Sequence, residues 1–191
     1  MRHFLYIPLL LAFASVASAV EQPKGFGLVP KEKLDGARLL MKEAGASLTA
    51  PNADWVWLTP FNSADKSFMC FSNKTGAGIT VSIGDMVNGD MDEHTKTELI
   101  TGCKQSAAKQ GATVSNEKFE PSEIPFPKKS WRYSYTATAG PRKVVAIFYY
   151  IRTAGRSFVT IQGVSVDGVD TPTFHAFVSS LKMTEPAAPA K

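Results

Sequence analysis

The chain has 191 residues, of which 44% are hydrophobic, and a formal net charge of +4 at pH 7. This length favours one domain with a sizeable core. No stretch after the N-terminus is long and uncharged enough to cross a bilayer, which excludes a helical membrane span beyond that point.

Residues 1–19 have the three parts of a secretory signal peptide. The basic start Arg2-His3 precedes the apolar run Phe4–Ala14, and Ala17-Ser18-Ala19 fits the small-x-small cleavage rule. We therefore expect the mature chain to begin near Val20 and the protein to be periplasmic or secreted. The cleavage point has no cysteine, so a lipoprotein anchor is not indicated.

Residues 20–50 are expected to form an N-terminal extension with one helix. Pro30 suits the first helical position, where its missing N–H costs nothing. Gly36 and Gly45 weaken the pattern, because glycine disfavours helix interiors. Apolar residues nevertheless recur at helical spacing, as on one face of a helix: Leu34, Ala37, Met41, Ala44 and Leu48.

Residues 51–184 carry the pattern of an α/β sandwich domain, and the Pro-rich and Ala-rich residues 185–191 are expected to be a disordered tail. A strand is expected at Trp55–Leu58. A hairpin should follow, formed by Ser67–Ser72 and Gly78–Ile83.

Two helices are expected in this domain. The first should run from Asp92 to Gly111, with Asp90 and Glu93 resembling a capping box at its start. Thr171 should cap the second, in which apolar residues recur at helical spacing. The expected buried residues of the two helices are Leu99, Ile100, Cys103 and Ala107, and Phe174, Phe177, Val178 and Leu181.

After a strand at Ala112–Phe119, the chain should form a three-stranded meander of Trp131–Ala137, Lys143–Arg152 and Arg156–Val166. The run Val144–Ile151 is apolar at both sets of alternating positions. This pattern is typical of a central strand that is covered on both faces. The sequence therefore predicts an α/β (α+β) fold with a mainly antiparallel sheet.

The meander is also the basic part of the chain. Positions 124–166 contain seven basic residues and no acid, whereas all 17 acids lie elsewhere. Such a stretch can meet a protein partner or an anionic envelope component, or it can consist of solvated strand ends. Export argues against nucleic acid as a partner. The candidate partner-binding residues are Arg132, Arg142, Lys143, Arg152 and Arg156.

Two further pairs of residues leave alternatives open. Trp55 and Trp57 lie on the same side of one strand, either as a ligand platform or as core anchors. Cys70 and Cys103 could form a disulfide, which would stabilise the fold by about 3–4 kcal/mol, or they could be reduced core residues.

Catalytic motifs have little support. Ser63-x-x-Lys66 resembles a fragment of penicillin-binding proteins, but the chain lacks the large helical lobe that these enzymes need. His94 and His175 have no companions at metal or triad spacing. We therefore expect no metal, no cofactor and no catalytic residue, while enzymatic activity stays open.

The order of elements resembles that of the PsbP/Mog1-like fold family. The matching features are Trp55-x-Trp57, Ile79–Ile83, the long helix from Asp92, Trp131-x-Tyr133-x-Tyr135, and Arg156–Ile161 before a terminal helix that ends Ser180-Leu181-Lys182. The resemblance implies an antiparallel sheet sandwiched by helices and a non-enzymatic accessory role with protein partners. It carries over no functional residue, and the helix expected at 31–48 would be an added element.

The leading hypothesis is an exported, non-enzymatic accessory protein that binds through its basic meander. A small periplasmic hydrolase with a pocket near Trp55 and Trp57 is one alternative. A carrier that holds a small apolar ligand between sheet and helix is another. The sequence does not give the oligomeric state.

Overall fold

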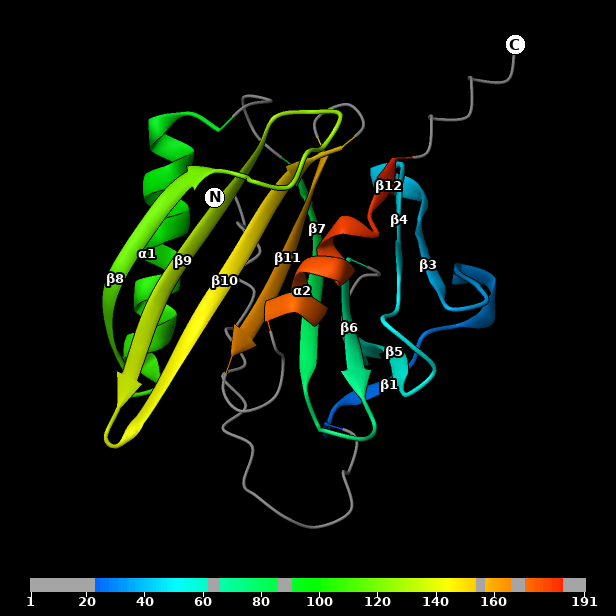
Figure 1. Cartoon of the computed structure of the whole chain (residues 1–191), viewed down its shortest axis with the longest axis horizontal. Helices are drawn as coiled ribbons and strands as arrows, with labels where there is room; N and C mark the ends of the chain where they lie inside the picture. The colour runs from blue at the N-terminus through cyan, green and yellow to red at the C-terminus, as the bar shows by residue number, and fades with distance from the viewer. Residues whose placement is uncertain (1–22, 62–65, 86–90, 154–156, 166–170, 184–191) are drawn as a thin grey trace.

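The computed structural model describes residues 23–61, 66–85, 91–153, 157–165 and 171–183 (Figure 1). The expected signal peptide and tail lie outside these ranges. Within them, an eight-stranded antiparallel sheet has the order β1-β5-β6-β7-β11-β10-β9-β8. Its strands are β1 (Phe26–Leu28), β5 (Trp55–Pro60), β6 (Ser67–Ser72), β7 (Gly78–Asp85), β8 (Thr113–Pro121), β9 (Ser130–Ala139), β10 (Arg142–Arg152) and β11 (Ser157–Ser165).

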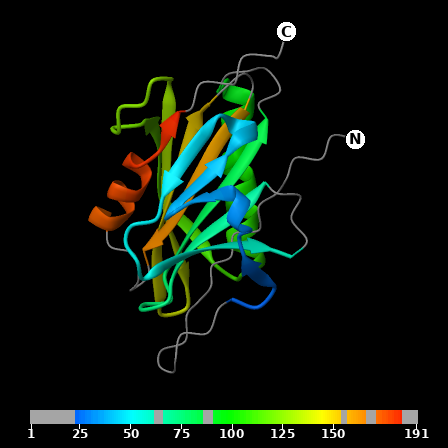
Figure 2. The same ribbon diagram turned by 90° about the vertical axis from the view of Figure 1, so that its right-hand side faces the viewer.

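A second, four-stranded sheet has the order β12-β4-β3-β2. It contains β2 (Leu34–Asp35), β3 (Arg38–Met41), β4 (Ala46–Thr49) and β12 (Lys182–Met183), with short 3-10 turns η1 (Lys31–Lys33) and η2 (Lys42–Ala44). The helices α1 (Glu93–Lys109) and α2 (Thr171–Ser179) lie on opposite sides of the large sheet (Figure 2). The expected fold, a mainly antiparallel sheet sandwiched by helices, is confirmed.

Strand β10 is covered on both faces, as its sequence predicts. Ile147, Tyr149 and Ile151 belong to the core on the α2 side. Ala146 and Phe148 alternate with them and belong to the core on the α1 side. The three strands of the meander are confirmed, with ends that differ from the expected ones by no more than two residues.

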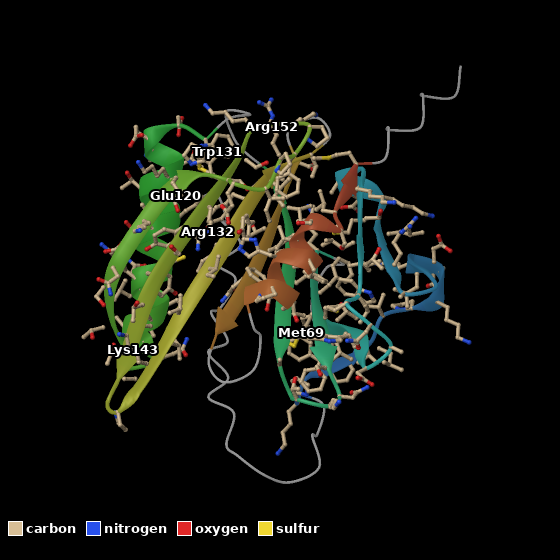
Figure 3. All side chains as sticks on the ribbon, viewed as in Figure 1. Met69, Glu120, Trp131, Arg132, Lys143 and Arg152 are labelled. Carbon is tan, nitrogen blue, oxygen red and sulfur yellow. The ribbon has the colours of Figure 1, made fainter. Side chains whose placement is uncertain are left out.

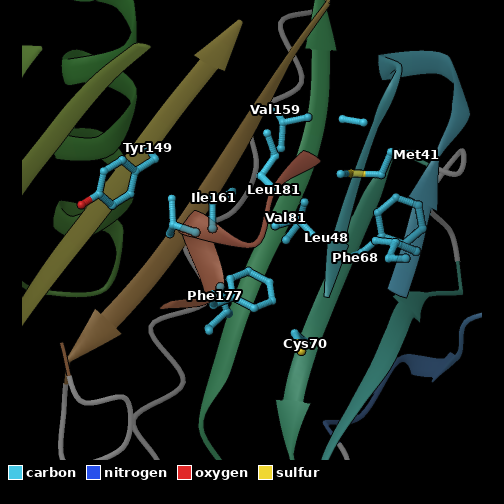
Figure 4. Packing of buried hydrophobic residues seen from close by; sticks show 14 of the residues in the cluster. Met41, Leu48, Phe68, Cys70, Val81, Tyr149, Val159, Ile161, Phe177 and Leu181 are labelled. Carbon is cyan, nitrogen blue, oxygen red and sulfur yellow. The ribbon is translucent and has the colours of Figure 1, made fainter. Parts of the chain in front are cut away.

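The α2-side core joins the two sheets (Figure 4). Phe177 and Val178 of α2 are fully buried in it, together with Leu48 of β4. Phe174 packs directly against the backbone of Gly163 on β11, where an added Cβ would lie 2.6 Å from the ring carbon Cε2. Burial of side chains of this size contributes about 1.5–3 kcal/mol each.

The helix expected at residues 31–48 is wrong, because this segment forms β2, β3 and β4. Gly36 and Gly45 have φ angles of +59° and +57°, which reverse the chain and cannot occur inside a right-handed helix. In β3, buried and half-buried residues alternate with a period of two. The segment also shares the core of the domain, since β4 pairs with β12 at the other end of the chain.

Both helices of the domain are confirmed. The side chain of Asp92 caps α1 by accepting a hydrogen bond from the Thr95 N–H at 2.7 Å. The expected capping residue Asp90 lies outside the described ranges. In the described part of the chain, no helix is long and apolar enough to cross a membrane.

We expect Gly163→Ala to lower the free energy of unfolding by about 1–3 kcal/mol, because the new methyl group would overlap the buried Phe174 ring. Urea unfolding measures the change. The double variant Gly163→Ala/Phe174→Leu should recover part of the loss, since the two sites are in contact. Equal stability of Gly163→Ala and the wild type would contradict this packing.

Candidate functional site

The basic residues of the meander do not all face solvent. Arg132 on β9 has a side chain that is 18% exposed, and its Nη1 lies 2.9 Å from Oε1 of Glu120. Its Nε lies 3.5 Å from Oε1 of Glu123. Lys128 donates a hydrogen bond to the Thr153 carbonyl at 2.6 Å. Glu120 and Glu123, which lie just before the basic stretch, therefore offset part of its charge, and Lys128 is held by a carbonyl within the stretch.

The remaining candidates lie at different ends of the meander. Lys143 is exposed near the start of β10, and Arg152 is half-buried at its end (Figure 3). The nine residue-to-residue steps of strand between them span roughly 30 Å. Arg142 begins β10 beside Lys143, and Arg156 lies outside the described residues. The described members of the predicted set thus do not form one patch.

Four residues from separate parts of the chain form a polar group that we call the Glu123 cluster: Glu123, Arg132, Tyr149 and His175. Tyr149 donates a hydrogen bond to Oε1 of Glu123 at 2.6 Å. Nε2 of His175 lies 3.4 Å from the Tyr149 hydroxyl oxygen and 3.5 Å from Oε1 of Glu123. Because the single hydroxyl proton of Tyr149 goes to Glu123, the proton in the contact with His175 has to come from Nε2.

The surroundings of the Glu123 cluster favour a charged carboxylate on Glu123 and a protonated hydroxyl on Tyr149. Burial acts to raise the pKa of Glu123, but hydrogen bonds from Tyr149 and the backbone, with the charges of Arg132 and His175, hold the pKa below its ordinary value. Burial raises the pKa of Tyr149, so this hydroxyl stays protonated and donates. The cluster thereby fastens both α2 and the connection before β9 to the large sheet.

A second polar contact lies beneath α1. Glu117 of β8 accepts a hydrogen bond from the Tyr133 hydroxyl at 3.0 Å and pairs with Lys104 of α1 at 2.9 Å. Burial raises the pKa of Tyr133. Like the Glu123 cluster, this contact joins a helix to the sheet. Among the described residues, His, Cys, Asp and Glu form no group of three or more that could hold a metal ion.

Of the two alternatives for Cys70 and Cys103, the structure has the reduced core residues, since both are free thiols and no disulfide joins them. Cys70 belongs to the α2-side core and Cys103 packs against the α1-side core, so the large sheet separates them. Spacing along the chain did not reveal which face each cysteine occupies. Burial raises the pKa of Cys103 to about 12 and also raises that of Cys70, which makes both poor nucleophiles.

The two tryptophans lie at the α2-side core. Trp57 is 4% exposed, and its indole N–H donates to the Ala37 carbonyl at 2.9 Å. Its ring centroid is 5.8 Å from that of Phe177. Trp55 is half-buried against the same core. The ring of Trp57 therefore serves packing, and Trp55 alone of the pair keeps part of its surface exposed.

A hollow of about 310 Å³ lies between the 3-10 turns and the large sheet, away from α2. Two lysines and two glutamates line it together with apolar side chains. Nζ of Lys33 lies 5.8 Å from the centroid of the Phe68 ring, so the lysine side chain already covers the aromatic ring of this hollow. Between α2 and the sheet, where a carrier would hold its ligand, the Phe174 ring packs directly on Gly163.

Large apolar side chains are exposed at the β1 end of the large sheet. Phe61 is 73% exposed and Leu28 is 66% exposed. The Phe61 ring lies against Gly27, with Cε1 2.8 Å from the position that a Cβ would take. We call Leu28 and Phe61 the apolar edge. Sequence analysis missed it, because a single Phe and a single Leu in separate segments give no signal.

Glu123→Gln should reduce the loss of stability on acidification. A carboxylate whose pKa is lowered by folding stabilises the protein at neutral pH, and this contribution disappears as pH falls below the ordinary pKa of about 4.3. Because Glu123 is 48% exposed, we expect a difference below about 1 kcal/mol. Urea midpoints between neutral and acidic pH measure it. Glu93→Gln, at a side chain that is 88% exposed and outside the Glu123 cluster, is the matched control for removal of a carboxylate.

The free thiols give a second prediction. Protein purified without reductant should show both Cys70 and Cys103 as titratable thiols in denaturant, and almost no reaction with a thiol reagent in the native state. In denaturant, Cys103→Ser should lower the number of titratable thiols from two to one. Absence of thiols in the denatured protein would mean that the two cysteines are bonded.

No protein-family model matches the chain, and no curated protein matches it. The solution structure of cyanobacterial PsbP (CyanoP) from Synechocystis sp. PCC 6803 is similar, with a TM-score of 0.56 and 12% identity, over 90% of this chain and 99% of that chain. A crystal structure from Bacteroides thetaiotaomicron VPI-5482 gives a TM-score of 0.47 and 10% identity, too low to bear on the fold, over 80% of this chain and 50% of that chain. The chain has a PsbP-like fold, as its element order predicts.

Proposed function

We propose that the chain is an exported, non-enzymatic accessory protein that binds a protein partner, with the apolar edge as its main contact. The exposure of Leu28 and Phe61 carries this proposal. Export is supported by the N-terminal pattern of residues 1–19. The PsbP-like fold fits an accessory role in general.

The apolar edge has the chemistry of an anchor. Leu28 pairs with Leu58, whereas the Phe61 ring lies on the Gly27 side of β1, so the two side chains project from opposite faces of the same edge. A partner that covers this edge can therefore bury one large apolar side chain on each face, and exposed apolar surface of this kind is typical of interaction sites. Burial of a side chain such as Leu28 or Phe61 contributes roughly 1.5–3 kcal/mol. Two such anchors in a desolvated centre suffice to dominate an interface of modest size.

The basic residues of the meander take a secondary part in this proposal. Arg132 is paired with Glu120 and Glu123, so it stabilises the fold. Lys143 and Arg152 are far apart and act as rim charges. Rim charges change the rate of association and its salt dependence more than the affinity.

Capture of partners from native envelope extract tests the proposal. Wild-type protein should retain one or more proteins. The double variant Leu28→Ser/Phe61→Ser should retain at least about tenfold less of each, as expected when anchors are removed. Both side chains are exposed, so the melting temperature should stay within a degree or two of the wild type.

Val145→Ser is the matched control, because Val145 is the third exposed large apolar residue of the described chain, at 39%, and lies on β10 away from the apolar edge. It should retain the partner. Loss of partner with Val145→Ser but not with Leu28→Ser/Phe61→Ser would overturn the assignment of the surface. If Lys143→Glu or Arg152→Glu lost the partner and Leu28→Ser/Phe61→Ser did not, the contact would lie on the basic meander instead.

A further inference from the structure

The large sheet has two edge strands, β1 and β8, within the described part of the chain. An edge strand presents backbone N–H and C=O groups on its outer side, and these groups can pair with a strand of another chain. Natural proteins block such pairing with charges, prolines, bulges or very short strands. The two edges of this sheet differ in these features.

Strand β8 is blocked along its length. Its pairing with β9 shifts register between Ser115 and Lys118, which is a bulge. Asn116 within this bulge has a φ of +54°, which turns the backbone away from regular strand geometry. The strand also carries three charged residues and ends at Pro121: its sequence is Thr-Val-Ser-Asn-Glu-Lys-Phe-Glu-Pro.

Strand β1 is short, at three residues, but it has no charge, no proline and no bulge between Gly25 and Val29. Its bonds to β5 come from alternate residues: the Val29 N–H donates to Trp57 and the Phe61 N–H donates to Gly25, both at 3.0 Å. In an antiparallel pair the residues between these point their backbone groups the other way. The N–H and C=O groups of Phe26 and Leu28 therefore face outward.

We infer that β1 accepts an extended segment of the protein partner as an added strand, with apolar side chains at alternate positions that pack on Leu28. This inference rests on the proposed protein-binding function and specifies how the apolar edge is used. Backbone bonds to Phe26 and Leu28 supply affinity, and the exposed side chains of Leu28 and Phe61 supply selectivity.

The size of the edge favours a peptide-like segment over a second copy of this chain. The stretch Gly25–Val29 spans roughly 16 Å. Symmetric pairing of two such stretches covers far less than the roughly 1,200–2,000 Å² that stable protein interfaces bury. An extended segment that belongs to a larger partner has no such requirement at this strand alone.

Two substitutions at Leu28 distinguish the contribution of its backbone N–H to binding from that of its side chain. Leu28→Pro removes the outward N–H and keeps the inward bonds to β5, since proline is tolerated on edge strands where the N–H faces solvent. Leu28→Ala removes the side chain and keeps the N–H. Both variants are first checked for wild-type melting behaviour.

The probe is a fluorescein-labelled hexapeptide of alternating valine and threonine. Its binding to the full chain is measured by fluorescence anisotropy. Leu28→Pro should bind at least about tenfold more weakly than Leu28→Ala, as expected for a lost backbone bond and an obstructed edge. In hydrogen exchange by NMR, the amides of Phe26 and Leu28 should become protected when peptide is added, and those of β8 should not. A peptide with N-methyl groups on alternate bonding amides should fail to bind wild-type protein, which tests the inference even if Leu28→Pro does not fold.

Equal binding of the N-methylated peptide, or protection at β8, would overturn strand addition. Protection of Phe26 and Leu28 that grows with protein concentration without peptide would replace the partner with a second copy of the chain. If Leu28→Pro retains the extract partner that Leu28→Ser/Phe61→Ser loses, the proposed function stands and strand addition fails.

Discussion

The fold depends on the burial of β10 on both faces. Ile147, Tyr149 and Ile151 need an apolar layer on one side of the sheet, and Phe148 and Tyr150 need one on the other. The helix α1 supplies the second layer. The nine-residue α2 supplies only part of the first, and β3 and β4 complete it with Leu39, Met41 and Leu48. The N-terminal segment is therefore required by the core.

This division into two cores explains other features of the chain. A side chain on one face of the large sheet cannot reach a side chain on the other, so Cys70 and Cys103 remain separate. The polar contacts lie where each covering helix meets the sheet. The Glu123 cluster joins α2 to β9 and β10, and Glu117 joins β8 to α1 through Lys104. Both use a tyrosine whose ring is buried and whose hydroxyl reaches a carboxylate.

Local patterns predicted the meander, the hairpin of β6 and β7, and both helices, because each depends on periodicity over one continuous segment. The segment at 31–48 fits helical spacing at five positions, but Gly36 and Gly45 decide its structure through their positive φ. The Glu123 cluster could not be predicted, since Glu123 and His175 are 52 positions apart and meet only through β9 and β10. Counting charges along the chain also failed to pair Arg132 with Glu120 and Glu123, because both acids lie outside the stretch 124–166.

The contrast between the two sheet edges bears on function more directly than the net charge of the meander does. A bulge with a positive φ at Asn116, three charges and a terminal proline all act against pairing at β8. If edge protection were a general requirement of this fold, β1 would need it as well, because its outer backbone groups belong to Phe26 and Leu28. Instead, the only such protection of β1 is its length of three residues, and the two most exposed large apolar side chains of the described chain lie at this edge. An edge of this composition is a liability in a protein that acts alone, and it is a suitable contact in a protein that works bound to a partner.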